Sequence, residues 1–242
     1  MLTVLTHEFF FIPKKEIWFY DGGDIKPAAY TSFCYAFTRP SVQIDTEVKE
    51  FTTLLDLHTD ESGLYDAISS TFRYHIRKAE QAGVQCIYNI GPSVADCREV
   101  IRRFNAFAAK KKITPANSKR ILALQQQNKI VISKAVQADS TLVTHVYLHD
   151  GKRILLMHTF HDEDGANPQL RGYANKSLHW EDIRLFREKG FHTYDFGGIN
   201  MEELPGISHF KLSFGGKAVQ ADSFIAVMSV LRPFYKLYKN LR

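Results

Sequence analysis

The stretch that decides the fold is YDFGGINMEELPGISHFKLSFGGK, residues 194–217. In it, a run ending in Tyr-Asp-Phe passes into the glycine pair 197–198, and a second pair, 215–216, follows a short helical segment. Glycine is favoured where φ must be positive or where another group approaches the backbone closely. Two glycine corners with Lys211 between them therefore indicate a loop shaped around a ligand, although two tight turns with no further role would leave the same pattern.

Outward from this stretch, strand and helix patterns alternate. Apolar and β-branched runs bounded by turn residues indicate strands, and apolar residues that repeat every three to four positions indicate helices. Gly83 ends an early helix over 61–83, and Ser93 with Asp96 forms a capping pair that opens the next helix. Strands are expected at 84–90, 129–137, 140–150, 152–161, 191–196 and 217–228, and helices from 93, at 115–128, at 176–190, at 206–214 (or a turn there) and at 229–242.

The order of elements predicts an α/β protein. Residues 84–242 read β-α-α-β-β-β-α-β-α-β, with one more helix at the end. Residues 1–83 hold aromatic and β-branched runs separated by Gly and Pro, followed by the early helix. Because no linker rich in Gly, Pro or Ser divides the chain, we expect a short β-rich N-terminal region, 1–83, packed on a domain formed by 84–242.

The composition is typical of a soluble globular chain: of 242 residues, 45% are hydrophobic and 24% are charged. A formal charge of +5 is compatible with an anionic partner, such as a nucleotide, a nucleic acid or a membrane surface. Three cysteines without CxxC spacing argue against a disulfide framework or a structural zinc site and favour the cytoplasm. We read no signal peptide at the N-terminus and no apolar run long enough for a membrane span.

Three stretches resemble the Fem family of peptidoglycan-bridge aminoacyltransferases, a branch of the GNAT acyltransferases. FRYHIRKAEQAGV (72–84) is similar to the family's basic helix and the strand after it, and ANKSLHWEDIRLFREKG (174–190) to its central helix. YDFGGI with GISHFKLSFGG (194–216) is similar to its strand, glycine turn and Phe-Lys motif. The resemblance implies a GNAT-like mixed central sheet flanked by helices, and an enzyme of acyl or aminoacyl transfer with no metal and no tightly bound cofactor.

The resemblance makes Lys211 a catalytic candidate. Amide formation from an activated acyl donor develops negative charge on the tetrahedral oxyanion and on the leaving group, and a fixed ammonium stabilises that charge. A solvated helix lysine is the alternative. Asp195 ends the strand before the first glycine pair, where it could orient the acceptor amine or take its proton. It could equally bond to the backbone of the glycine turn, as aspartate does in turns.

Arg171, Asn175 and Lys176 precede the predicted central helix. Common acetyl-CoA enzymes carry Gln/Arg-x-x-Gly-x-Gly/Ala at this position and hold the pyrophosphate on backbone N–H groups. Here the register reads Arg-Gly-Tyr-Ala-Asn-Lys over 171–176, so the arginine is kept and both later small positions are changed. We therefore expect aminoacyl-tRNA, the family's usual donor, rather than acyl-CoA as the co-substrate, with these three residues as binding candidates.

Further binding candidates lie on the early helix and in the opening stretch. Arg73 and Arg77 are one turn apart and could clamp a diphosphate, since guanidinium groups match phosphate oxygens. They could instead pair with Glu80 on the surface. The predicted binding set is completed by four residues of the opening stretch: Tyr194, Gly197, Gly198 and Phe210. For Phe210 a place in the core is the alternative to stacking on a substrate.

Two other patterns bear on possible partners and on a metal. The basic segments AAKKK (108–112) and KLYKNLR (236–242) could contact a tRNA acceptor stem or anionic lipid, or could be solvated helix faces. His158 and His161 lie three apart in a predicted strand, so their side chains should point to opposite faces. We therefore expect no shared metal there.

Together these features predict a cytoplasmic N-acyltransferase or aminoacyltransferase of cell-envelope biogenesis. No Cys or Ser lies in a recognisable nucleophile setting, so the acceptor amine should attack the donor directly. Fem enzymes usually hold two complete GNAT-like units, and 1–83 is short for one. The acceptor could then be a lipid-linked precursor or a smaller amine, such as an amino sugar on a nucleotide or an envelope glycan. The alternatives are an acyl-CoA-dependent N-acetyltransferase acting on an amino sugar or nucleotide sugar, and a non-catalytic RNA- or membrane-binding module.

Overall fold

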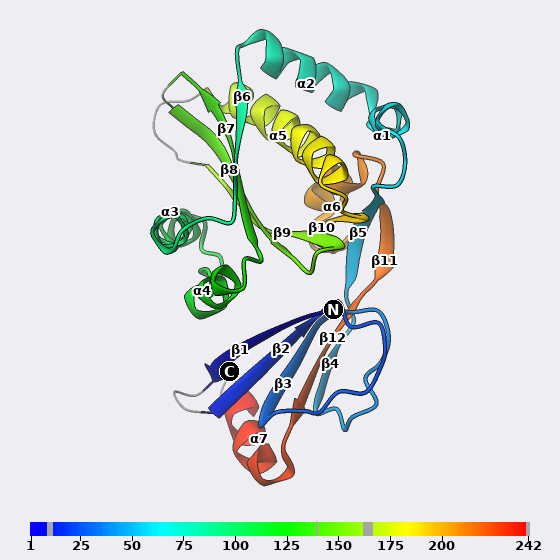
Figure 1. The fold of residues 1–242 in the computed structure, drawn as a ribbon, viewed down its shortest axis with the longest axis vertical. Coiled ribbons are helices and arrows are strands. Elements are labelled where there is room, and N and C mark those ends of the chain that lie inside the picture. The colour runs from blue at the N-terminus through cyan, green and yellow to red at the C-terminus, as the bar shows by residue number, and fades with distance from the viewer. Residues whose placement is uncertain (9–11, 139, 162–166, 241–242) are drawn as a thin grey trace. The chain divides into compact units, whose positions relative to one another are not determined.

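The computed structural model describes residues 1–8, 12–138, 140–161 and 167–240 (Figure 1). The chain forms two compact units: one is Met1–Thr52 together with Val219–Arg242, and the other is Thr53–Ala218. The chain thus begins in the first unit, builds the second, and returns to the first. The predicted α/β class with mixed sheets flanked by helices is confirmed. Within the described ranges, no helix is long and apolar enough to cross a membrane.

Within the described residues, the first unit is a five-stranded sheet in the order β1-β2-β3-β12-β4, with a short 3-10 helix and an α-helix. β2 and β3 are parallel, whereas β12 is antiparallel to both β3 and β4. Its core contains Ile17, Phe33 and Phe224. Its elements are β1 (Leu2–Glu8), β2 (Ile12–Trp18), β3 (Tyr30–Ala36), β4 (Thr46–Val48), β12 (Asp222–Val227), η1 (Ser229–Leu231) and α7 (Arg232–Asn240).

The second unit is built on a seven-stranded sheet in the order β11-β5-β10-β9-β8-β7-β6. β6 to β9 are antiparallel neighbours, and β10 is parallel to β9. Figure 1 shows α2 and α5 on one side of this sheet and α3 and α4 on the other. Its elements are β5 (Phe51–Asp56), α1 (Glu61–Ala67), α2 (Ser70–Gln81), β6 (Gln85–Ile90), α3 (Val94–Lys111), α4 (Ser118–Gln126), β7 (Ile130–Gln137), β8 (Ser140–His149), β9 (Arg153–Phe160), α5 (Pro168–Glu188), β10 (Thr193–Ile199), α6 (Pro205–Leu212) and β11 (Lys217–Gln220).

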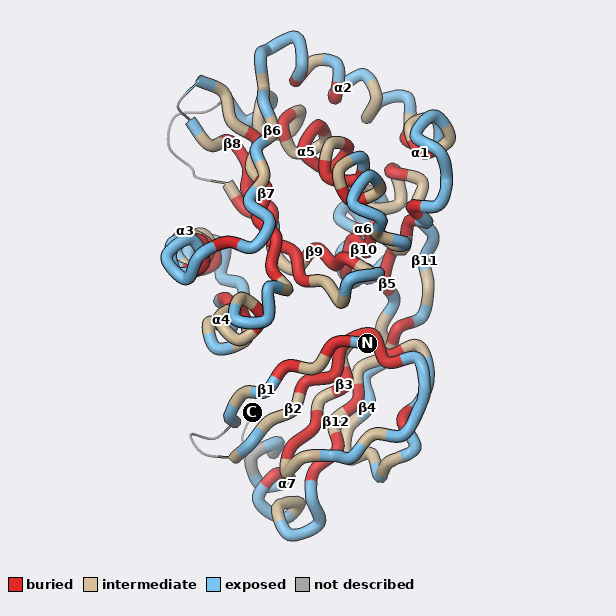
Figure 2. Tube along the Cα trace, viewed as in Figure 1, coloured by how far each residue is buried: buried red, intermediate tan, exposed pale blue. Residues whose placement is uncertain are grey.

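Helix α5 is held on the sheet by an apolar stripe. Trp180, Ile183 and Phe186 are buried in one core with Tyr147 of β8 and Phe196 of β10. Figure 2 shows buried stretches on each of β8, β9, β10 and α5. Burying a large apolar side chain contributes roughly 1.5–3 kcal/mol, so this stripe is sufficient to place α5 and the polar residues that it carries.

Several predicted boundaries differ from the structure. The Ser93–Asp96 capping box and the left-handed φ of Gly83 are confirmed. The single early helix is wrong: it is two helices, because the backbone leaves the helical region at Ile68 and Ser69 then caps α2. The single strand over 217–228 is also wrong, since β11 and β12 belong to different sheets.

The division into units does not follow residue 83, where the sequence places a boundary. Helices α1 and α2 precede that point but join the second unit, where Ile68 and Ile76 are buried in the same core as Trp180. β12 and α7 complete the first unit, and Thr46 hydrogen-bonds to Tyr235, 189 residues away along the chain. Local patterns do not report such pairings, because the partners are distant in sequence.

Candidate active site

The candidate site begins where β9 and β10 separate. The two parallel strands pair only between residues 153–155 and 193–195. Beyond Asp195 the chain turns at Gly197, whose φ of 77° is a left-handed value that favours glycine. A Cβ on Gly197 would also lie 3.2 Å from the carbonyl oxygen of Leu156, so the turn is pressed close to β9.

On the facing strand, a β-bulge in β9 changes which side chains point toward the site. Val146 of β8 pairs with His158, but the next residue, Tyr147, pairs with Leu156, so β9 carries one extra residue at this point. The bulge reverses the alternation of side chains along the strand. Leu156 and Thr159, which are three positions apart, can therefore line the same cavity.

Two adjoining cavities occupy this region. The first, about 350 Å³, is lined by Leu156 and Thr159 of β9, Asn175 and His179 of α5, and Gly206, Ile207, Phe210 and Lys211 of α6. The second, about 380 Å³, shares Thr159 and Asn175 with the first and extends to Arg171 and Gly172 in the early turns of α5. The two cavities thus adjoin at Thr159 and Asn175.

Lys211 lies in the last turn of α6 and is partly buried in the wall of the first cavity. Its Nζ donates to the carbonyl oxygen of Gly198 at 2.6 Å. Burial lowers the pKa of Lys211 from 10.5 to about 8, and the charge of Asp195 opposes that shift. The first glycine turn thus holds an ammonium group whose charge changes close to neutral pH.

Asp195 is fully buried and is not among the residues that line either cavity. Its Oδ1 accepts a hydrogen bond from the backbone N–H of Gly197 at 2.8 Å. This is the turn-holding geometry that the sequence allows as an alternative to a catalytic role. A direct role for Asp195 in proton transfer stays a prediction.

The second glycine pair has a packing role. A Cβ on Gly215 would lie 2.5 Å from the Cβ of Ala67 at the end of α1, and one on Gly216 would lie 2.5 Å from Cγ2 of Thr53 in β5. Side chains essentially never approach so closely. The pair therefore lets the chain pass between α1 and β5, whereas the pair 197–198 shapes the cavity.

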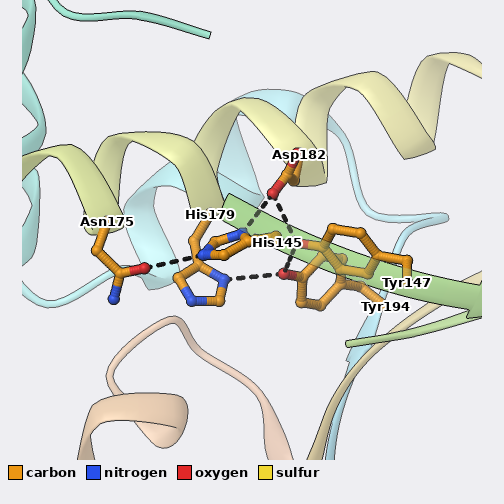
Figure 3. A network of polar contacts seen from close by, with 6 residues as sticks. All are labelled: His145, Tyr147, Asn175, His179, Asp182 and Tyr194. Atoms are coloured by element: carbon orange, nitrogen blue, oxygen red, sulfur yellow. Dashed lines mark hydrogen bonds and ion pairs between the residues drawn. The ribbon is translucent and has the colours of Figure 1, made fainter. Parts of the chain in front are cut away.

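Five buried polar side chains and the half-buried Asn175 form a network that reaches the first cavity at Asn175 and His179 (Figure 3). The Tyr147 hydroxyl donates to Oδ2 of Asp182 at 2.6 Å and lies 2.8 Å from the Tyr194 hydroxyl. The Tyr194 hydroxyl lies 2.8 Å from Nδ1 of His179. His145 places Nδ1 2.8 Å from Oδ2 of Asp182 and Nε2 2.9 Å from Oδ1 of Asn175.

His179 connects this network to the cavity. Burial holds the pKa of His179 well below 6.5, and the charges of His145, Lys211 and Lys176 lower it further. The imidazole is therefore neutral at neutral pH. A neutral imidazole has one N–H donor and one bare nitrogen that can accept a proton.

The three residues proposed for the donor lie inside α5 and not before it, which corrects the sequence-based boundary. Asn167 caps the helix through the N–H of Gln169 at 2.8 Å, and Pro168 is the first helical residue. The N–H of Arg171 bonds to the Asn167 carbonyl at 3.0 Å. Packing of α5 on the sheet outweighs the weak helix propensity of its first residues, so the register that resembles a pyrophosphate loop is helical.

The side chains of these three residues have different positions. Asn175 lines both cavities and Arg171 lines the second. Lys176 donates to the carbonyl of Gly172 at 3.0 Å and lies over the rings of Phe72 and Phe210, at 4.9 and 5.6 Å. The structure thus brings Arg171, Asn175 and Phe210 to the cavities and places Lys176 in an aromatic setting beside them.

Arg73 and Arg77 are not among the residues that line these cavities. Arg73 donates to the carbonyl of Asp66 at 2.8 Å, and Arg77 reaches the hydroxyl of Tyr65 at 3.4 Å. Both join α2 to α1, and the partner of Arg73 is Asp66 rather than Glu80. Tyr194 is fully buried, and its hydroxyl is linked to the cavity by its hydrogen bond with His179, which lines the cavity.

His158 and His161 were expected on opposite faces of one strand, and this is wrong. β9 ends at Phe160, and the rings of His158 and His161 lie against Phe104 and Phe107 of α3, at 4.1 and 5.3 Å between centroids. In the part of the chain that the structure describes, no three His, Cys, Asp or Glu side chains are arranged to hold a metal ion.

Sequence reasoning missed four residues of the network: His145, Tyr147, His179 and Asp182. A signal for them was available in their spacing. His145 and Tyr147 are two apart in a strand and share a face, and Asn175, His179 and Asp182 share a face of a helix. Polar residues repeated within an otherwise apolar stripe would have marked both segments.

Comparison with known proteins gives one sequence family. Residues 68–212 match the family described as acetyltransferase (GNAT) domain. A comparison with curated proteins found no match.

Solved structures share the fold at low sequence identity. The chain is similar to FemX, with a TM-score of 0.64 and 10% identity over 97% of this chain and 85% of that one. It is similar to L-PGS from Bacillus licheniformis, with a TM-score of 0.55 and 12% identity over 87% of this chain and 72% of that one. It is also similar to the C-terminal domain of a protein from Agrobacterium fabrum that is named for a lysylphosphatidylglycerol synthetase. The TM-score is 0.54 and the identity 10%, over 81% of this chain and 67% of that one.

Proposed function

The chain belongs to the GNAT acetyltransferase family, an acyl-transferring enzyme family, and from that premise we propose that it is an aminoacyltransferase. It would move an aminoacyl group from an aminoacyl-tRNA, a cytoplasmic donor, to a primary amine of a cell-envelope or glycan precursor. The observation that carries the proposal is Lys211, a partly buried ammonium that donates to the Gly198 carbonyl at the wall of the first cavity.

The chemistry follows from that position. The acceptor amine attacks the acyl carbon, and negative charge develops first on the carbonyl oxygen and then on the departing oxygen of the donor. An ammonium already in place at a water-poor wall stabilises this charge without reorganising at the moment of reaction. Asn175 and Arg171, which line the adjoining cavity, would contact the donor.

The start of α5 favours a donor other than acyl-CoA. Pro168 has no N–H, the N–H of Gln169 is bonded to the capping side chain, and that of Arg171 is bonded within the helix. Few backbone donors are left for a pyrophosphate.

The acceptor is proposed to lie at an anionic membrane surface. One of the structures that share this fold is named for a lysylphosphatidylglycerol synthetase, and lysylphosphatidylglycerol is an aminoacylated lipid. In α7 and η1, Val230, Phe234 and Leu237 are 68%, 71% and 63% exposed, while Tyr235 is buried. Residues 229–240 carry three basic side chains and no acidic one. An exposed apolar face beside lysines suits anionic lipid.

A competition between donors tests the proposal. The protein is incubated with a mixed pool of tRNA charged with labelled amino acids, or with acetyl-CoA, in the presence of amino sugars, nucleotide amino sugars and lipid-linked precursors. We expect an amide product from the tRNA pool, and weak or no binding of acetyl-CoA by calorimetry. Micromolar binding and turnover of acetyl-CoA, with no response to charged tRNA, would replace the proposal with the acyl-CoA-dependent alternative.

A further inference from the structure

The buried network determines which nitrogen of His179 carries the proton. Oδ2 of Asp182 lies 2.6 Å from the Tyr147 hydroxyl and 2.8 Å from Nδ1 of His145. A carboxylate oxygen can only accept, so both groups donate to it. The one hydroxyl proton of Tyr147 is therefore committed to Asp182, and its oxygen can only accept from other neighbours.

The donor and acceptor of the next two hydrogen bonds are then fixed as well. The Tyr194 hydroxyl, 2.8 Å from that of Tyr147, must donate to it. Its own oxygen is then the acceptor for Nδ1 of His179 at 2.8 Å. His179 is consequently protonated at Nδ1, and because the ring is neutral, its Nε2 is bare.

Figure 3 shows the two ring nitrogens of His179 on opposite sides, one toward Tyr194 and the other away from the network. Within the described residues, no hydrogen-bond partner reaches Nε2. His179 lines the same cavity as Lys211 and Asn175. A network that served only to attach α5 to the sheet would not need to end in an unprotonated nitrogen at a cavity wall.

We propose that His179 is a catalytic residue that accepts the proton of the acceptor amine at Nε2, and that Tyr194, Tyr147 and Asp182 are positioning residues that hold it in the Nδ1–H form. This role rests on the proposed function as an N-acyltransferase, but it does not depend on which donor is used.

The step balances without a further reactant. The amine nitrogen forms a bond to the acyl carbon, and the adduct nitrogen loses a proton to Nε2 of His179. The bond between the acyl carbon and the leaving atom of the donor, which is oxygen in an aminoacyl ester and sulfur in an acyl thioester, then breaks. Its electron pair leaves with that atom, which takes the proton back from Nε2. During the interval His179 is an imidazolium, and its Nδ1–H remains directed through two hydroxyl groups to the carboxylate of Asp182. Such transfers typically contribute about 10²- to 10⁴-fold in rate.

The tautomer is tested without any substrate. In protein labelled with ¹⁵N-histidine, the resonances of His179 are assigned by their loss in His179→Gln. We expect a pyrrole-like signal for Nδ1 and a pyridine-like signal for Nε2 at neutral pH. An Nε2–H tautomer or an imidazolium in the wild-type protein would overturn the proposal, whatever the donor proves to be.

The catalytic role is tested by turnover with whichever donor and amine form an amide. His179→Gln should lower kcat by about 10²- to 10⁴-fold with little change in KM. Tyr194→Phe should shift the tautomer signals and lower kcat by roughly 10- to 100-fold, by analogy with the cost of removing a partner that orients a metal-bound imidazole. Tyr20→Phe is the control: it removes another hydroxyl, which donates to the carbonyl of Gly23 at 2.7 Å. It should leave the His179 tautomer signals and kcat unchanged. Wild-type kcat in His179→Gln would sink the proposal even with the expected tautomer.

Discussion

At the scale of single residues, the cavity brings together a lysine and a histidine whose pKa values are both lowered, first of all by burial. The two shifts suit opposite tasks. Lys211 keeps its charge up to a pKa of about 8 and can stabilise a developing anion, while His179 stays neutral and can take a proton. Such a pair, separated by environment alone, is typical of active sites.

We expect Lys211→Met to lower turnover by about 10²- to 10³-fold, the usual cost of losing one charge-stabilising donor. The same change should raise the free energy of unfolding at pH 7, because a lysine with a lowered folded-state pKa is a cation that folding disfavours. Lys217→Met, at an exposed position six residues on, is the matched control. Wild-type turnover and an unchanged melting temperature in Lys211→Met would instead identify Lys211 as a solvated helix residue without a catalytic role.

The pH dependence of the rate should report the same group. With a folded-state pKa of about 8 against 10.5 in the unfolded chain, Lys211 loses its proton as the pH rises through 8, so kcat should fall there. Between pH 8 and 10.5 the unfolded chain binds more protons, so this residue's contribution to stability should increase over that range. A profile of kcat that stays flat to pH 10 would contradict a catalytic ammonium at this position.

At the scale of elements, the glycine pair after α6 lets the chain pass between α1 and β5. Gly216→Ala should destabilise the protein by about 1–3 kcal/mol, because the new methyl group would overlap Cγ2 of Thr53. Gly206→Ala in α6 is the control, since a Cβ there meets nothing within 4 Å and alanine favours a helix. Equal melting temperatures for the two variants would show that the close approach does not constrain the chain.

Helix α7 is the element that we assign to the membrane. The protein should sediment with vesicles that contain phosphatidylglycerol and not with phosphatidylcholine vesicles, and the paired change Phe234→Ser with Leu237→Ser should abolish binding. Leu5→Ser removes an equally exposed leucine, 69% against 63% for Leu237, and should have no effect. Association into a dimer that these two serines disrupt, without lipid binding, would instead identify a second copy of the chain as the occupant.

At the scale of the whole molecule, the charge of +5 is the property most relevant to tRNA. Binding to a polyanion releases counterions, so the logarithm of affinity should fall with the logarithm of salt by about 0.9 for each duplex phosphate neutralised. We expect steep weakening of tRNA binding between low and physiological salt, measured by filter binding with charged and uncharged tRNA. An apparent Kd that is constant across that range would remove the tRNA donor from the proposal.

Much of the site's outline could be predicted from sequence, because it depends on short-range effects. The glycine turn at 197–198, the place of Lys211 beside it and the likeness of this stretch to the Fem family are all contained in one run of residues. The chemistry behind the cavity could not be predicted in this way. His145 meets Asp182 across 37 positions and Tyr147 meets Tyr194 across 47.

The sequence by itself determined the features that act over a few residues: the capping box at Ser93, the helix end at Gly83, and the family. Only the tertiary structure decided where α5 begins, how β12 and α7 return to the first unit, and which nitrogen of His179 is bare. The physical reason is the distance along the chain between the residues that interact. Caps and hydrophobic periods are set by neighbours along the chain, whereas burial, pKa and the direction of a hydrogen-bonded network are set by segments that meet only in the folded state.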